Sequence, residues 1–326
     1  MKHSNQKMKL LYLAKILLEN TDEEHSLTVV QMIDKLSQFG VSAERKSIYD
    51  DIECLRQFGL DICSVKTRFT GYYIAGRDFE LPELKLLVDS VQSSKFITSK
   101  KSLELISKIE KLTSREGAKK LHRQVYVTNR IKTLNEQIYY NVDKIHEAIA
   151  DNRQIRFKYF GYDVNKEKIY RKDGEYYTES PVALTWDDEN YYLITYKAKY
   201  ENYTHYRVDK MDNISVCDET RVLSEKEFDL SKYTKTMFQM FSGEETDVSM
   251  RFSNDLVSVV FDKFGMNIPI IKNGADHFIC NVKVSVSKQF LGWVLSFGNR
   301  AKILSPEIVV EEMRKLINEV SKNYSE

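Results

Sequence analysis

Glycine, proline and cysteine are scarce in this chain of 326 residues, with 12, 4 and 4 copies. Disordered segments are usually rich in glycine and proline, so their scarcity argues against a chain dominated by disorder. The cysteines Cys54, Cys63, Cys217 and Cys280 have no short Cys-x-x-Cys spacing. We therefore expect reduced thiols, and neither a structural zinc site nor a disulfide framework.

Long apolar runs and catalytic motifs are also missing. The N-terminal residues Met-Lys-His-Ser-Asn-Gln-Lys lack an apolar core segment, and no run of about 18 apolar residues occurs. We therefore expect neither a signal peptide nor a membrane span, and predict a cytoplasmic protein without a membrane partner. None of the six histidines lies in a His-Glu-x-x-His motif, and the chain has no Gly-x-Ser-x-Gly elbow or glycine-rich phosphate loop. We expect no enzymatic activity, no cofactor and no catalytic or structural metal.

Apolar residues, at 42%, and charged residues, at 30%, are those of ordinary globular protein. The length exceeds the usual size of one core, which predicts two or three domains. The net charge of +1 hides an uneven distribution, because residues 95–132 hold 11 Lys or Arg against 3 Glu, whereas residues 218–247 hold 8 acidic against 4 basic residues. The basic segment should meet either DNA or the acidic segment, and the sequence leaves both open.

Residues 8–58 show the periodicity of three short amphipathic helices. Thr28 and Ser42 are the candidate N-caps of the second and third helices. Residues 60–74 contain two apolar runs around a polar turn, which predicts a β-hairpin. This order of elements indicates a winged helix-turn-helix. The residues expected to face inward are Leu10, Leu13, Ala14, Leu17, Leu18, Val30, Ile33, Leu36, Ile48, Ile52 and Leu55.

The third helix begins with cationic and polar side chains on its outward face. They are Arg45, Lys46, Ser47 and Tyr49. In helix-turn-helix proteins this end of the helix enters the major groove, where cations hold phosphates and one or two side chains read base edges. With Lys66 and Arg68 of the hairpin turn, these residues are predicted to contact double-stranded DNA. The alternative is a packing module with a solvated basic face, since residues 41–75 hold 5 basic and 5 acidic residues.

The segment Arg45-Lys-Ser-Ile-Tyr-Asp-Asp-Ile-Glu-Cys-Leu-Arg56, followed by Gly71-Tyr-Tyr-Ile74, resembles the helix-turn-helix of DeoR-like and WYL-domain regulators. The resemblance covers residues 8–75. It implies that Arg45, Lys46, Ser47 and Tyr49 make the DNA contacts.

Residues 79–138 read as a helical linker. Pro82 stands in the first turn of a helix, and apolar residues recur at helical spacing through Leu103, Ile106 and Leu112. A palindromic operator needs two DNA-binding domains at a fixed separation, so we expect this linker to join two chains in a homodimer. The alternative is a plain connector.

Period-two alternation predicts strands at residues 154–160, 191–196 and 204–210. Turns between them are expected at Gly161, at residues 173–174 and at residues 187–190. Short, tyrosine-rich strands at this spacing predict a small β-barrel or sandwich.

The strand at 204–210 would place His205, Arg207 and Asp209 on one face. A guanidinium fork binds phosphate and a tyrosine ring stacks on a base, which favours a nucleotide or single-stranded nucleic acid as effector. The candidate effector-binding residues are Tyr191, Tyr192, Arg207, Asp209, His205, Arg156 and Lys158. As alternatives, Tyr192 is a core residue, Arg207 and Asp209 pair only with each other, and the remaining cations are simply solvated.

Residues 140–220 resemble the WYL domain, an Sm-like barrel of bacterial transcription regulators. Its Trp-Tyr-Leu triplet falls on Tyr191-Tyr192-Leu193, and its Arg-x-Asp-Arg element falls on Arg207-Val-Asp-Lys210. The resemblance implies an effector site that controls an attached DNA reader.

The last hundred residues show a β-α-β-β-α-β order followed by a helix from Pro306, which suggests a ferredoxin-like sandwich. This part resembles the C-terminal extension that commonly follows WYL domains. The predicted elements are strands at 248–252, 268–271, 278–286 and 301–304, with a helix at 256–264 and another before the last strand.

The sequence therefore predicts a multidomain α+β protein. Its parts are a winged helix-turn-helix (1–78), a helical linker (79–138), a WYL-like Sm-like barrel that senses the effector (139–222) and a ferredoxin-like extension (223–326). The predicted function is sequence-specific transcription regulation through a DNA operator. The alternative is a defence component that binds nucleic acid without sequence preference.

Overall fold

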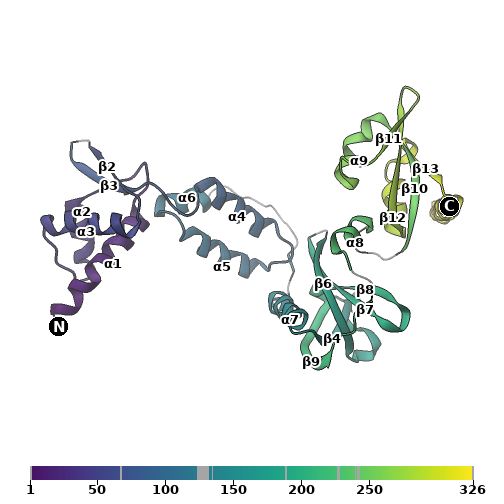
Figure 1. Cartoon of the computed structure of the whole chain (residues 1–326), viewed down its shortest axis with the longest axis horizontal. Helices are drawn as coiled ribbons and strands as arrows, with labels where there is room; N and C mark the ends of the chain where they lie inside the picture. Colours follow the sequence, from purple (N-terminus) through teal and green to yellow (C-terminus); the bar gives the residue numbers. More distant parts are fainter. Residues whose placement is uncertain are drawn as a thin grey trace. The chain divides into compact units, whose positions relative to one another are not determined.

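The computed structural model describes residues 2–66, 68–122, 132–133, 135–187, 189–225, 228–238, 240 and 243–324. They form two compact units, Met1–Glu136 and Gln137–Glu326, each described by itself (Figure 1). Helices and several sheets are mixed in the chain, so the multidomain α+β prediction is confirmed. Residues 123–131 of the predicted linker and Asp188 of the predicted 187–190 turn lie outside the described residues.

The N-terminal subdomain, from α1 to β3, has three helices around one core. The helices are α1 (Lys2–Asn20), α2 (Val29–Ser37) and α3 (Arg45–Phe58). The strands β1 (Leu27–Thr28), β2 (Ile62–Lys66) and β3 (Thr70–Ile74) form an antiparallel sheet in the order β1-β3-β2. The predicted hairpin is confirmed, and Ile48, Ile52 and Leu55 of α3 are buried as expected.

Two details of these helices differ from the prediction. Thr28 does cap α2, but the buried stripe runs through Val29, Met32 and Leu36, while Val30 is exposed, since it lies about 100° around the helix from Val29. Ser42 is not the N-cap of α3, which begins at Arg45 after an extended Glu44. The N–H of the buried Val41 closes the end of α2 on the carbonyl of Leu36, so α3 starts later than expected.

Three further helices follow within the described residues of the first unit. They are α4 (Leu81–Ser93), α5 (Ser99–Glu110) and α6 (Arg115–His122). Pro82 lies in the first turn of α4 as predicted, and Ser114 accepts a hydrogen bond from Gly117 N at the start of α6. Lys132, one of the cations of the basic segment, donates to the carbonyls of Val91 and Ser94 at the end of α4.

The second unit begins with α7 (Ile138–Ala150), which packs on a curled six-stranded sheet (Figure 1). The sheet runs β5-β4-β6-β7-β8, and β9 pairs with β4. Asn141 and Lys144 of α7 donate to the carbonyls of Met211 and Ile214 in β9. The strands are β4 (Arg153–Tyr162), β5 (Lys168–Tyr170), β6 (Tyr177–Asp187), β7 (Asn190–Lys197), β8 (Asn202–Arg207) and β9 (Met211–Thr220).

Two predictions for this sheet are wrong. Gly161 lies inside β4 and not in a turn, because β4 continues to pair with β5. The expected strand at 204–210 ends at Arg207, and the short 3-10 helix η3 (Val208–Lys210) follows it. The side chain of Val208 is fully buried, and this turn lets the chain return as β9 to pair with β4.

The C-terminal elements follow one another in the predicted order. After α8 (Leu230–Thr236), four strands form an antiparallel sheet in the order β11-β12-β10-β13, with Phe252, Val260, Phe290 and Val309 in its core. The elements are β10 (Glu244–Ser253), α9 (Val257–Phe264), β11 (Ile270–Asn273), β12 (His277–Val286), α10 (Lys288–Leu295), β13 (Ala301–Ser305) and α11 (Glu307–Lys322). Within the described residues, no helix is long and apolar enough to cross a membrane.

The capping box of α2 provides a direct test of the N-terminal subdomain. The Thr28 hydroxyl accepts from Gln31 N while the Gln31 side chain accepts from Thr28 N. Thr28→Ala should lower the free energy of unfolding by about 1 kcal/mol, measured by urea denaturation. Ser42→Ala is the matched control, because Ser42 does not cap α3, and an equal loss in both variants would contradict the assignment.

Candidate functional site

The cationic start of α3 is exposed to solvent. Arg45, Lys46 and Tyr49 all lie on the surface, and the Tyr49 ring is half exposed. Its edge contacts the ring of Tyr72 in β3, with centroids 6.4 Å apart, so the helix and the hairpin support each other. Such a pair of elements can present cations and hydrogen-bonding groups together to an anionic surface.

The hairpin carries the other two predicted DNA contacts. Lys66 ends β2 and is exposed. The Arg68 guanidinium lies 5.7 Å from the centre of the exposed Phe69 ring, so the tip of the hairpin combines a cation with an aromatic surface.

Ser47 differs from these residues because it takes part in the anchoring of α3. Its hydroxyl accepts from Lys9 Nζ at 3.1 Å and donates to Glu44 O at 3.1 Å. Lys9, on α1, also lies 2.8 Å from Asp51 Oδ2, and both side chains are largely buried. The sequence analysis missed Lys9, since nothing in the pattern of α1 shows that it faces α3.

Arg207 is held in a fixed orientation at the end of β8. Its Nε and Nη2 donate to the two carboxylate oxygens of Asp209 at 3.0 and 2.9 Å, and Nη2 also donates to Asn190 Oδ1 at 2.8 Å. The hydrogen bond to Asp209 raises the pKa of the Arg207 guanidinium. The structure thus brings Arg207 and Asp209 together, although Asp209 belongs to η3 and not to the strand.

Tyr192 and His205 lie on the face of β7 and β8 that Tyr233 of α8, Met237 and Met240 cover. Tyr192 and Ile194 form a hydrophobic cluster with Met237 and Met240. His205 Nε2 lies 3.0 Å from the Tyr233 hydroxyl, and burial lowers the pKa of His205 to about 4. Tyr191 faces the opposite side of β7 from Tyr192. Its ring packs against that of Trp186, with the centroids 4.7 Å apart.

Arg156 and Lys158 project from β4 beside exposed tyrosines. Both cations lie over the ring of Tyr176, at 5.3 and 5.2 Å from its centre, and Lys158 also lies 5.7 Å from the ring centre of Tyr170. Arg156 Nε donates to Ser215 Oγ at 2.9 Å. These two predicted effector contacts therefore share one aromatic neighbour.

The short 3-10 helix η1 (Arg171–Gly174) adds two cations that the sequence analysis missed. Arg171 lies 5.3 Å from the ring centre of Tyr159, and Lys172 lies 4.1 Å from that of Tyr177. Lys172 and Asp173 have φ values of 51° and 53°, a strained conformation for residues other than glycine. An Arg-Lys pair directly before an Asp-Gly turn was the available signal.

Tyr159 links η1 to Arg207. Its hydroxyl accepts from Arg207 N at 3.2 Å, and burial raises the pKa of this phenol. We call the four cations Arg156, Lys158, Arg171 and Lys172, together with Tyr159, Tyr170, Tyr176 and Tyr177, the η1 surface. Cations alternating with aromatic rings can bind phosphates and stack on planar groups.

Among the described residues, no three His, Cys, Asp or Glu side chains gather as metal ligands. The side chains that lie close together on the six-stranded sheet are instead cations and tyrosines, with Asp209 beside Arg207 and Asp212 hydrogen-bonded to Tyr170. Their chemistry is that of anion binding and stacking.

Two family models match parts of this chain. Residues 140–216 match the WYL domain and residues 244–321 match the WCX domain. No curated protein matches the chain.

Among solved structures, the chain is similar to proteasome accessory factor B/C (PafBC) of Arthrobacter aurescens and to a CRISPR Cas-related protein. The first is 17% identical, with a TM-score of 0.28, and the match covers 98% of this chain and 49% of that one. The second is 21% identical, with a TM-score of 0.35, and the match covers 67% of this chain and 60% of that one. This chain thus spans about half the length of the first structure.

The lowered pKa of His205 predicts how the stability of the second unit depends on pH. The unfolded imidazole binds a proton below about pH 6.5, whereas the folded one does so only near pH 4. The stabilising contribution of neutral His205 is complete above pH 6.5 and is lost as the pH falls toward 4. His205→Gln should therefore show a smaller loss of melting temperature between pH 7.5 and 5 than the unmodified chain.

His146→Gln, on the exposed side of α7, is the matched control for this measurement. A His205→Gln variant with the same pH dependence as the unmodified chain would show that His205 is not the titrating group.

Proposed function

We propose that this chain is a bacterial cytoplasmic transcription regulator and not an enzyme. In this proposal, a DeoR-like winged helix-turn-helix reads a double-stranded operator, and the WYL domain, as an Sm-like barrel, binds a nucleotide or single-stranded nucleic acid. The WCX domain, as a ferredoxin-like sandwich, and the helices α4 to α6 contribute to a homodimer. The presence of the WYL and WCX domains supports this arrangement.

The DNA-reading role rests on the exposure of the cations at the start of α3, on the side opposite the buried core. Ile48, Ile52 and Leu55 bury one side of α3, and this leaves Arg45 and Lys46 exposed at the helix start. Free backbone N–H groups and the helix dipole favour phosphates at this same end. The adjacent hairpin adds further cations, as a wing would.

The η1 surface supports the effector-binding role. Each of its four cations already lies over a tyrosine ring, and the backbone N–H of Arg207 donates to the Tyr159 hydroxyl beside them. Because Tyr233, Met237 and Met240 cover Tyr192 and His205, we assign the direct contacts to the cations of the η1 surface and to Arg207. Tyr191, Tyr192 and His205 then support these residues from within the sheet.

The DNA-reading role is tested by a titration at fixed salt against the chain's own upstream DNA and a scrambled duplex. Arg45→Ala/Lys46→Ala should weaken binding to the upstream DNA at least tenfold, roughly the loss of one base or phosphate contact of about 1 to 3 kcal/mol. Lys15→Ala/Lys85→Ala removes the same charge elsewhere in the first unit and should change binding little.

Three results would count against specific DNA reading. Unchanged affinity of the Arg45→Ala/Lys46→Ala variant would remove α3 from the interface. Equal binding of the unmodified chain to both duplexes would favour the nonspecific defence component. Binding to neither duplex would reject both functions.

The effector-binding role is tested by adding short single-stranded oligonucleotides, or mononucleotides, to the same titration. Arg171→Ala/Lys172→Ala should abolish the change in operator affinity that the oligonucleotide causes, while operator affinity without oligonucleotide stays the same. Lys199→Ala is the control, because Lys199 lies over the Tyr200 ring at 5.3 Å in a similar pair away from η1. A full response in the η1 variant would place the sensor elsewhere.

A further inference from the structure

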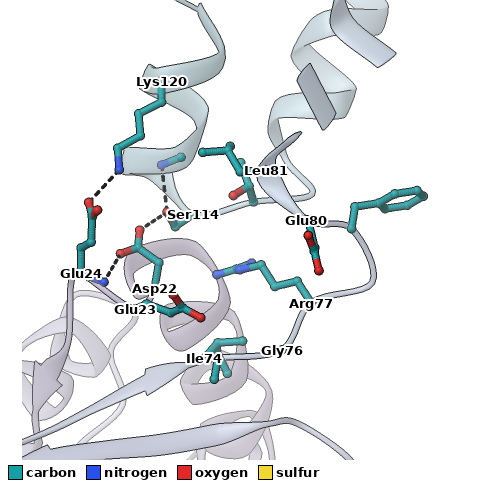
Figure 2. Close-up of a pocket in the computed structure, with 14 residues that line it drawn as sticks. Asp22, Glu23, Glu24, Ile74, Gly76, Arg77, Glu80, Leu81, Ser114 and Lys120 are labelled. Atoms are coloured by element: carbon teal, nitrogen blue, oxygen red, sulfur yellow. Dashed lines mark hydrogen bonds and ion pairs between the residues drawn. The ribbon is translucent and has the colours of Figure 1, made fainter. Parts of the chain in front are cut away.

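The turn between α1 and β1 is held to the start of α6 by polar contacts (Figure 2). Ser114 Oγ donates to Asp22 Oδ2 at 2.5 Å. Lys120 Nζ lies 2.7 Å from Glu24 Oε2, and Arg115 Nη2 lies 3.2 Å from Glu19 Oε2. Arg115 and Lys120, two cations of the basic segment, therefore pair with carboxylates of the N-terminal subdomain. The sequence had left open DNA and the acidic segment as partners, and these carboxylates belong to neither.

Asp22 is the centre of this cluster. Its Oδ1 accepts from Glu24 N at 3.0 Å, from His25 N at 2.9 Å and from His25 Nδ1 at 2.7 Å. Partial burial would raise the pKa of Asp22, but the hydrogen bonds from Ser114 and His25 outweigh it and hold that pKa below its usual value. The carboxylate also lies at the N-terminus of α6, where the helix dipole favours a negative charge.

Thr21, the residue before Asp22, ties the hairpin to the same turn. Its buried hydroxyl donates to Leu17 O at 2.7 Å and accepts from Ile74 N at 3.0 Å. Arg77, just before α4, donates to Leu18 O at 2.7 Å and Thr21 O at 2.8 Å. Carbonyl groups at the end of α1 lack helical partners, and this guanidinium satisfies them.

Packing is open on the side of α6 that faces this cluster, although Leu121 of the same helix is buried. An open pocket of about 490 Å³ lies beside the cluster, lined among others by Ile74, Phe79, Leu81 and Ser114. Where apolar surfaces stand apart, dispersion contributes little. The polar contacts of Asp22 and Glu24 therefore have a larger share in fixing α6 than similar contacts in a packed core.

A continuous set of contacts leads from this turn to α3. The turn is followed by β1, where Leu27 and Thr28 pair with Tyr72 and Gly71 of β3. The ring of Tyr72 then meets that of Tyr49 on α3. A displacement of the turn would thus be transmitted to α3, the helix that carries Arg45 and Lys46.

We propose that Asp22 is a positioning residue for DNA binding, because it fixes α6 on the N-terminal subdomain and so sets how α3 is presented. This inference rests on the proposed function and names a residue that controls it without touching DNA. It gives the helices between the DNA reader and the effector domain a defined point of attachment through which they act on α3.

The test compares Asp22→Ala with Glu23→Ala in the full chain. Glu23 is an exposed carboxylate of the same turn and lines the same cavity, so it is a matched control. Hydrogen exchange should become faster in α6 for Asp22→Ala only, while exchange in α3 stays unchanged and shows that the subdomain is folded. Affinity for the upstream DNA should fall about tenfold, a usual size for coupling between sites, with affinity for the scrambled duplex unchanged.

A charge exchange tests the same attachment without altering Asp22. Glu24→Lys and Lys120→Glu should each lower operator affinity about threefold, a modest change because the pair is exposed. The double variant should restore the affinity, since it re-forms the ion pair with reversed charges. Additive losses in the double variant would contradict the attachment.

The remaining outcomes separate this inference from the proposed function. If Asp22→Ala shows faster exchange in α6 but binds the operator as tightly as Glu23→Ala does, the positioning role is rejected and DNA reading stays intact. Unchanged exchange in α6 would show that Asp22 does not hold the helix. If the unmodified chain does not prefer its upstream DNA, and Arg45→Ala/Lys46→Ala has no effect either, both proposals fail together.

Discussion

The buried carboxylate of Glu179 is the constraint on which the curled six-stranded sheet depends. Glu179 is 3% exposed, and a charge removed from water in this way must be paired and hydrogen-bonded. It pairs with Lys197 and accepts from the Tyr206 hydroxyl at 2.8 Å. These residues belong to β6, β7 and β8, so one carboxylate fixes the relative register of three neighbouring strands.

This register decides which side chains of β8 are available for binding. Because Tyr206 points toward Glu179 and the aromatic rings of Phe157 and Tyr177, its neighbours His205 and Arg207 face the other side. There His205 meets Tyr233, while Arg207, at the end of the strand, is oriented by Asp209 and Asn190. The two candidate residues on this strand thus have different environments: neutral His205 is covered, and Arg207 is partly exposed.

Local patterns predicted the elements well, and long-range contacts were beyond them. The hairpin after α3, the Thr28 cap and the helix at Pro82 follow from short-range chemistry, and each is present. The contact of Lys9 with Ser47 joins residues 38 positions apart, and that of Ser114 with Asp22 joins residues 92 apart. No periodicity encodes such pairs, so the basic segment could be recognised from the sequence but its carboxylate partners could not. The strand at 204–210 was misread because alternation continued through Asp209 while the buried Val208 turned the chain.

Met237 and Phe238 are adjacent in the chain but belong to different hydrophobic clusters. Met237 packs with Tyr192 and Ile194 of the barrel, whereas Phe238 packs with Phe290 in the core of the C-terminal sheet. A fragment that ended at residue 222 would expose the apolar face of β7, and one that began after residue 240 would leave a gap beside Phe290. The segment between the WYL and WCX matches therefore gives side chains to each of two hydrophobic clusters, and the two parts are best expressed as a single piece.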